Sequence, residues 1–256
     1  MKTPARDSAS LETRRSICRR AFDAARGLLQ CHGTPALKRR LWDWEFRRGR
    51  WACLDETPDD PAHTYLTQYA SGGRILDLGC GPCGASRYLD PATYASYVGV
   101  DISGVAVEQA RRKNTRAQNS YVQSDFEDYR PDVPFDVILL GDSLYYLSVK
   151  DALGMLRRYQ QHLSSGGVFI VKMHRTISNQ PFFRLIDDHF QVVARHLHDQ
   201  VTIVIFRVVL LAAAWWADVD AESLLALSGS PVLARWRRAR ARPTCGRPAE
   251  PHGGPA

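Results

Sequence analysis

The fold is decided by the stretch Arg74-Ile75-Leu76-Asp77-Leu78-Gly79-Cys80-Gly81-Pro82-Cys83-Gly84-Ala85-Ser86. It opens with a short apolar run suited to a buried parallel strand. Gly79 permits a tight turn, Gly81 lets the backbone approach a ligand, and Gly84 lets a following helix pack closely on the strand. Residues 97–101, Tyr-Val-Gly-Val-Asp, predict a second buried strand that ends in an acid. An acid there can accept hydrogen bonds from ribose hydroxyls.

This order of elements predicts a cofactor that contains adenosine, and leaves a nicotinamide dinucleotide and S-adenosylmethionine open. The spelling Asp-Leu-Gly-Cys-Gly at 77–81 resembles the first motif of class I S-adenosylmethionine-dependent methyltransferases. Residues 124–127, 135–142 and 163–171 resemble later segments of that family, so the likeness covers about residues 60–210. The resemblance implies S-adenosyl-L-methionine as cofactor. It implies these cofactor-binding residues: Asp77, Gly79, Gly81, Gly84, Asp101, Ile102, Asp125, Phe126 and Gly141.

Strand and helix patterns alternate regularly through the centre of the chain, which predicts parallel strands joined by right-handed crossovers. The expected strands lie near 73–79, 96–101, 119–124, 134–141, 167–173, 190–197 and 201–209, and the expected helices near 62–70, 84–90, 104–117, 149–163 and 181–188. The last two strands are close enough to pair antiparallel. We therefore expect an α/β fold with a doubly wound, mostly parallel seven-stranded sheet. The resemblance implies the Rossmann-like methyltransferase form, with an antiparallel C-terminal hairpin and N-terminal helical additions.

Three parts of the chain are expected, from composition at both ends and from the extent of the resemblance in the centre. Residues 1–58 form a helical and aromatic cap segment, in which a helix runs from Ser10 to Gly33. Residues 59–211 form the cofactor-binding domain. Residues 212–256 are a basic extension rich in Pro and Gly, expected to be partly disordered.

Lys and Arg number 34 against 27 Asp and Glu, a formal charge of +7 that is concentrated near both ends of the chain. Basic ends suit nucleic acid or acidic lipid, or are ordinary solvated helix faces. Six scattered cysteines predict a reducing, cytoplasmic location. Cys80 and Cys83 spell CxxC, but no second pair or histidine cluster completes a zinc site, so we expect no metal. Residues 201–217 are apolar but short and interrupted by Arg207, so we expect no membrane span.

Residues 41–51 hold three tryptophans, at 42, 44 and 51, among basic residues. The segment resembles a Trp-Asp-x-Glu-Phe/Tyr…Gly-x-Trp stretch that precedes the core of several small-molecule methyltransferases. There it helps to cover the cofactor and to shape the acceptor pocket. Two other interpretations stay open: a helix packed on the domain edge, and a surface that stacks nucleic-acid bases.

Acceptor sites of open α/β sheets lie beyond the carboxyl ends of the strands. The fourth strand is followed by Asp142, Tyr145 and Tyr146, and the fifth ends at His174. We expect these side chains to meet over the cofactor, with one of the two tyrosines pointing into the core. His174 is the expected general base, because the pKa of free imidazole lies near working pH. Asp142 is expected to orient His174 or to cap the next segment, and Tyr146 to line the pocket.

The resemblance implies methyl transfer to an O or N atom of a small molecule, of natural-product or sugar type. The Leu-Tyr-Tyr-Leu at 144–147 resembles small-molecule methyltransferases, including the nodulation type that acts on chitooligosaccharides. The Asn/Asp-Pro-Pro-Tyr signature of enzymes that methylate base amino groups is absent. The alternatives are an RNA methyltransferase docked through the basic ends, a binding module without turnover, and a nicotinamide oxidoreductase. The acceptor, the methylated atom and the oligomeric state stay open.

Overall fold

A computed structural model describes residues 25–52 and 58–208 of the 256-residue chain. All of these residues belong to one compact unit. The start of the helix expected from Ser10, and the expectations for residues 212–256, lie outside the described residues. Residues 25–32 are helical, and this helix closes with Gly33 N donating to Leu29 O at 2.9 Å.

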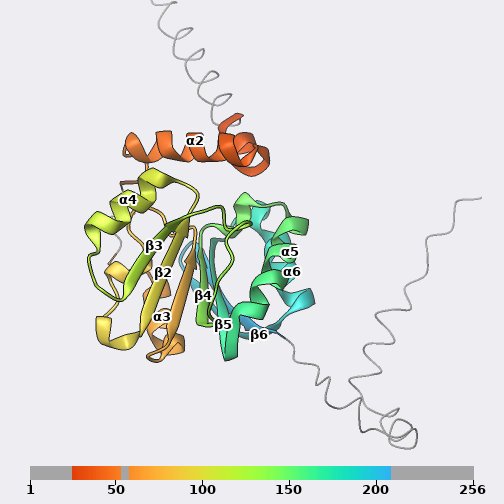
Figure 1. Cartoon of the computed structure of the whole chain (residues 1–256). Coiled ribbons are helices and arrows are strands. Elements are labelled where there is room, and N and C mark those ends of the chain that lie inside the picture. Colours follow the sequence, from red (N-terminus) through yellow and green to blue (C-terminus); the bar gives the residue numbers. More distant parts are fainter. Residues whose placement is uncertain (1–24, 53–57, 209–256) are drawn as a thin grey trace, which may run out of the picture. The chain divides into compact units, whose positions relative to one another are not determined.

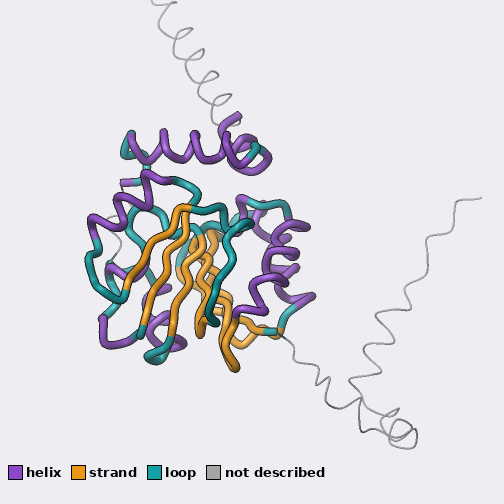
Figure 2. The backbone as a smooth tube through the Cα atoms, viewed as in Figure 1, coloured by secondary structure: helices purple, strands orange, loops and turns teal. Residues whose placement is uncertain are grey.

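The sheet has seven strands in the order β3-β2-β1-β4-β5-β7-β6 (Figures 1 and 2). Strands β1 to β5 pair in parallel, and β7 runs antiparallel to both β5 and β6. The predicted doubly wound sheet and C-terminal hairpin are therefore confirmed. The strand order reverses between β1 and β4, which is where open α/β sheets bind ligands. The strands are β1 (Arg74–Leu78), β2 (Ser96–Asp101), β3 (Asn119–Gln123), β4 (Phe135–Gly141), β5 (Leu163–His174), β6 (Gln191–His198) and β7 (Val201–Arg207).

The helices with described bounds are α2 (Pro35–Arg47), α3 (Ala62–Ala70), α4 (Gly104–Lys113), α5 (Val149–Tyr159) and α6 (Gln180–His189). The helix expected at 84–90 is wrong, because only the 3-10 turn Ala85–Arg87 forms there. Pro91 disfavours a helical Asp90, which is extended and whose side chain accepts from Ala92 N at 2.9 Å. The expected helix 149–163 also ends early, and residue 163 already belongs to β5.

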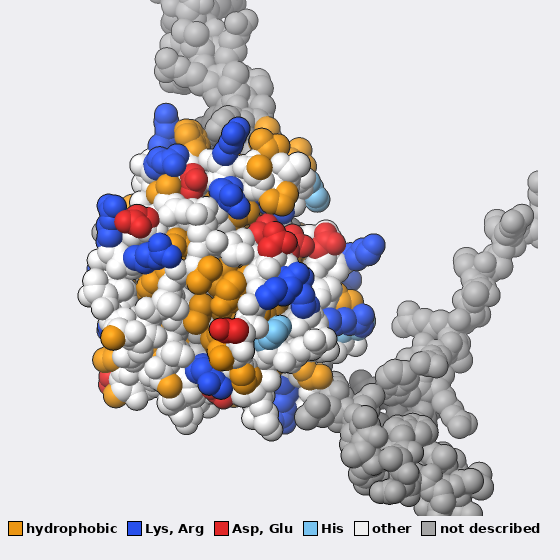
Figure 3. All heavy atoms as spheres, in the orientation of Figure 1, with side chains coloured by type: hydrophobic (Ala, Val, Ile, Leu, Met, Phe, Trp, Pro, Cys, Tyr) orange, Lys and Arg blue, Asp and Glu red, His pale blue; other side chains and the backbone are white. Residues whose placement is uncertain are grey.

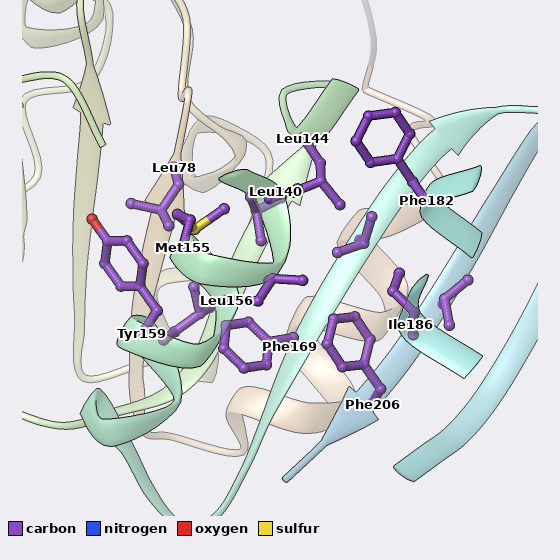
Figure 4. Packing of buried hydrophobic residues seen from close by; sticks show 14 of the residues in the cluster. Leu78, Leu140, Leu144, Met155, Leu156, Tyr159, Phe169, Phe182, Ile186 and Phe206 are labelled. Atoms are coloured by element: carbon purple, nitrogen blue, oxygen red, sulfur yellow. The ribbon is translucent and has the colours of Figure 1, made fainter. Parts of the chain in front are cut away.

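The larger core cluster lies between the sheet and helices α5 and α6. Strand residues such as Leu140 and Phe169 meet Leu156 of α5 and Ile186 of α6, and all four are fully buried (Figure 4). A second cluster packs α3 and α4 against the sheet through residues such as Leu66, Ile75 and Val107. The two clusters cover the two faces of the sheet, so the carboxyl ends of the strands remain available for a ligand.

Two acids fasten α2 and the segment after it to the domain. Asp43 Oδ1 accepts from Ser103 Oγ at 2.6 Å and from Val105 N at 3.2 Å, at the start of α4. Glu45 is fully buried, accepts from Trp51 Nε1 at 2.7 Å, and pairs with Arg26 at 3.3 Å. These contacts place α2 across the end of α4, as Figure 1 shows.

Gly84 is required for a different reason from the expected one. Its φ is +62°, and an added Cβ would lie 2.9 Å from Tyr97 Oη and 3.1 Å from the ring of Tyr121. The residue therefore lets the turn approach two buried tyrosines, rather than letting a helix pack on the strand.

This contact predicts unequal costs for two glycine substitutions. Gly166 also has a positive φ, of +85°, but an added Cβ would meet nothing within 4 Å. Gly166→Ala should therefore lower the free energy of unfolding by about 1–2 kcal/mol, the cost of left-handed backbone alone. Gly84→Ala should lower it by about 1–3 kcal/mol more, because of overpacking. Urea unfolding followed by circular dichroism measures both. Equal losses would show that the tyrosines do not crowd Gly84.

Candidate active site

A pocket of about 880 Å³, partly open to solvent, lies at the carboxyl ends of the strands and beneath α2. It brings together nine of the twelve residues predicted for the site: Gly79, Gly81, Asp101, Ile102, Asp125, Phe126, Gly141, Asp142 and Tyr146. Asp77 and Gly84 line a neighbouring pocket of about 630 Å³. The two pockets share Gly79, Gly81 and Gly141, so the glycine turn stands between them.

Asp77 holds the turn from the strand side. Its Oδ2 accepts hydrogen bonds from Tyr97 Oη and, at 3.4 Å, from Ala85 N. Tyr97 Oη in turn accepts from Ala85 N at 3.0 Å. Burial raises the pKa of the Asp77 carboxyl to about 6, and the hydrogen bond from Tyr97 opposes that rise. The conformation of the turn is therefore set by the buried hydrogen bonds among Asp77, Tyr97 and Ala85.

Asp101 holds the turn from the other side, at the carboxyl end of β2. Its Oδ2 accepts from Gly81 N at 2.9 Å and its Oδ1 from Ser103 N at 2.8 Å. Burial raises the pKa of the Asp101 carboxyl to about 6, and the nearby carboxylates of Asp77 and Asp43 add to the rise. A carboxylate has about four acceptor positions, so each oxygen of Asp101 keeps one for a ligand hydroxyl.

The segment after β3 is also fixed by local hydrogen bonds. Asp125 is buried, and its Oδ1 accepts from Glu127 N at 2.9 Å. The carbonyl of Phe126 accepts from Tyr159 Oη at 2.6 Å and from Arg158 at 2.9 Å. Both Asp125 and Phe126 line the larger pocket, so they add a carboxylate and an aromatic ring to its lining.

Aromatic side chains form much of the rest of the larger pocket. Trp42 of α2 is the centre of this aromatic wall, with ring centroids 5.0 Å from Tyr146 and 5.7 Å from both Phe46 and Trp51. The tyrosine expected to point into the core does so only in part, since Tyr145 packs against the core and also lines the pocket. Of the interpretations of residues 41–51, pocket wall and packing at the domain edge hold together.

Asp142 takes part in an ion cluster that the sequence did not predict. Lys172 Nζ pairs with Asp142 Oδ2 at 3.2 Å and also contacts Asp60 Oδ2. The two carboxylates raise the pKa of Lys172, against the effect of burial. Asp60 lines the smaller pocket and Asp142 the larger one, so Lys172 links the two. Among the described residues Asp142 orients no histidine, and the next 3-10 turn has no side-chain cap, so neither expected role of Asp142 is found there.

His174 is not brought to the site. It is exposed and lines neither of the two pockets. Gly141 at the end of β4 pairs with Lys172, so His174 lies two residues, about 7 Å, beyond that end. Residues alternate between faces along a strand, so Lys172 takes the place on the same face that was expected for His174.

Only weak signals in the sequence mark the site residues that were not predicted. Lys172 is a charged residue inside a buried strand, which is unusual and marks a paired or functional group. Lys38 and Gln30 line the pocket from the cap segment, where nothing in the sequence separates them from neighbouring polar residues. Within the described residues no three His, Cys, Asp or Glu side chains are grouped as a metal site requires. The same residues contain no helix long and apolar enough to cross a membrane.

Comparison with known proteins relates this chain to methyltransferases. A family model described as a methyltransferase domain matches residues 75–167. Cypemycin N-terminal methyltransferase from Streptomyces sp is 31% identical over 38% of this chain and 40% of its own length. Trans-aconitate 2-methyltransferase from Rhodopseudomonas palustris is 29% identical over 53% of each chain. The chain thus spans about half the length of the curated relatives it matches.

Among solved structures, N-methyltransferase NodS from Bradyrhizobium japonicum, in complex with S-adenosylhomocysteine, superposes with a TM-score of 0.50. The match covers 60% of this chain and 91% of that one at 17% identity, so it bears on the fold alone. The matched residues 75–167 contain the glycine turn, Asp101 and the aspartate after β4. Residues 75–167 therefore match a methyltransferase domain, and the chain is similar there to the class I S-adenosylmethionine-dependent methyltransferases.

Proposed function

We propose that this protein binds S-adenosylmethionine in the larger pocket and transfers its methyl group to a small molecule. The observation that carries the proposal is Asp101, a buried carboxylate that faces the glycine turn and keeps acceptor positions for the ribose hydroxyls. The adenine is proposed to lie near Asp125 and Phe126. The methionine part would then extend past Gly79 toward the smaller pocket, which Asp77 and Asp60 line.

Methyl transfer from a sulfonium is an in-line displacement that needs alignment, exclusion of water and an acceptor atom with a free electron pair. The aromatic wall would exclude water from the sulfonium and hold the acceptor. Burial raises the pKa of both Tyr145 and Tyr146, which keeps them as neutral phenols that donate or accept hydrogen bonds. Asp142 is proposed to bind the acceptor, with Lys172 holding its carboxylate in place.

A small acceptor fits this site better than RNA. The cap segment closes one side of the pocket through Trp42 and Trp51. Trp44 is covered by the guanidinium groups of Arg48 and Arg50, at 4.8 and 5.4 Å from its ring, and is no open platform for a base. On the face drawn in Figure 3, Lys and Arg are spread among hydrophobic and acidic side chains. A cytoplasmic location stays a prediction from the cysteine content.

The proposal predicts binding of S-adenosylhomocysteine in the micromolar range by isothermal titration, about −8 kcal/mol. Asp101→Ala should weaken that binding about tenfold or more, because charge-assisted hydrogen bonds to the ribose are lost. Binding of NAD without any binding of S-adenosylhomocysteine would replace the methyltransferase proposal with an oxidoreductase one.

The raised pKa of Asp101 predicts a pH dependence of the same affinity. The carboxyl is ionised above about pH 6 and gains a proton below it, which removes acceptor capacity for the ribose. The affinity for S-adenosylhomocysteine should therefore be constant above pH 7 and fall by up to about tenfold per pH unit below pH 6. Asp101→Asn should bind weakly at every pH and lose most of this slope. A slope kept in full by Asp101→Asn would assign the titration to Asp77, whose carboxyl has a similar pKa.

The position of His174 predicts that it takes no part in the chemistry. His174→Ala should leave turnover of any identified acceptor within about twofold, whereas loss of a positioned acid or base costs about 100- to 10,000-fold. Methyl transfer followed by mass spectrometry measures it. A loss of turnover of about 100- to 10,000-fold, with unchanged affinity for S-adenosylhomocysteine, would contradict this prediction. It would show that His174 acts in the site, which requires the end of β5 to move.

A further inference from the structure

One oxygen of Asp142 has no partner among the described residues. Asp142 Oδ2 pairs with Lys172, whereas Oδ1 is shielded from solvent and accepts no hydrogen bond. The residue has a left-handed backbone with a φ of +54°, and its N–H donates to the carbonyl of Lys172 at 2.9 Å. The backbone and the side chain of Asp142 are therefore both held in place, beside the pocket that the residue lines. A buried acceptor held in this way calls for a donor from a ligand.

The charges around the larger pocket favour a cation over an anion. Its acidic lining residues are Asp101, Asp125 and Asp142, and Lys38 is the basic residue that lines it. Asp101 is taken up by the ribose in the proposed function, which leaves Asp142 as the acid beside the aromatic wall. A carboxylate acceptor would meet like charges there, whereas an ammonium would meet opposite ones.

The aromatic wall gives a second reason for a cation. Trp42, Trp51 and Tyr146 come together with centroid distances of 5.0 and 5.7 Å between Trp42 and its two neighbours. The faces of such rings attract ammonium groups, and most strongly in sites sheltered from water. The wall and Asp142 line the same pocket.

Alcohol and amine acceptors also differ in how strong a base is needed to remove their proton. Among the described residues that line the pocket none is a histidine, and both tyrosines are kept neutral by burial. A carboxylate is a weak base, which does little for an aliphatic hydroxyl. It is sufficient to assist an ammonium, whose proton is held far less tightly than that of an alcohol.

We infer, on the basis of the proposed function, that the acceptor is an amine whose nitrogen donates to the Asp142 carboxylate against the wall of Trp42, Trp51 and Tyr146. The acceptor ammonium gives a proton to the Asp142 carboxylate and becomes a neutral amine. Its electron pair then forms the N–C bond as the C–S bond breaks, and the electrons of that bond go to sulfur. The products are the protonated form of the N-methylated acceptor and neutral S-adenosylhomocysteine. The proton on Asp142 is returned to water when the product leaves.

Three aromatic probes of similar size test the inference: 2-phenylethylamine, 2-phenylethanol and phenylacetate. Each is titrated into the full chain saturated with S-adenosylhomocysteine, with tryptophan fluorescence as the readout. We expect the amine to bind at least about tenfold more tightly than the other two, as a charge-assisted pair requires. Incubation with S-adenosylmethionine and mass spectrometry should then find the N-methyl product.

Asp142→Asn should weaken binding of the amine about tenfold and leave binding of the alcohol within about twofold. Asp188→Asn, an exposed aspartate of α6, is the matched control and should change neither. If Asp142→Asn does not fold, Tyr146→Leu serves instead and should weaken the amine more than the alcohol.

Equal or tighter binding of the alcohol or of phenylacetate would overturn the inference and leave the proposed function standing. The inference would also be overturned if Asp142→Asn lowers the affinity for S-adenosylhomocysteine tenfold and leaves the affinity for the amine unchanged, because the Asp142 carboxylate would then bind the ammonium of the cofactor. If the wild-type protein binds no S-adenosylhomocysteine, the proposed function fails and the inference fails with it.

Discussion

The glycine turn after β1 keeps its shape because two buried carboxylates hold it from opposite sides. Asp101 accepts from the N–H of Gly81, and Asp77 accepts from Ala85 N and from the hydroxyl of Tyr97. Burying these acids raises the pKa of each carboxyl to about 6, so the ionised form is held at an energetic cost. The cost is offset by the hydrogen bonds, and the result is a rigid turn with its backbone open to a ligand.

The second requirement is closure of the pocket, and it depends on the cap segment. Asp43 and Glu45 lie two residues apart on α2 and fix it in different directions, Asp43 to the start of α4 and Glu45 to Trp51. With both contacts made, Trp42 is held over the pocket against Tyr146. The acids of this segment are thus structural, and its rings are the part that lines the pocket. Catalysis by alignment and exclusion of water requires such a preformed wall.

Much of this architecture could be predicted from the sequence, because it depends on local patterns. Buried strands, glycine turns and the acid that ends β2 can be recognised from the order of residues along the chain. The helix expected at 84–90 failed where Pro91 overrides an otherwise permissive stretch. His174 failed because the relative ends of β4 and β5 are set by strand register, which no single segment encodes. The Lys172 cluster joins residues 60, 142 and 172, and only the folded sheet brings these together.

The most direct measurement of the central claim is a crystal structure of the full chain with S-adenosylhomocysteine. The account predicts both ribose hydroxyls within hydrogen-bond distance of Asp101, the adenine beside Phe126, and the sulfur facing Asp142 and Tyr146. The glycine turn should be unchanged, since its two carboxylates already hold it. A ligand bound elsewhere, or a ribose that makes no contact with Asp101, would contradict the account.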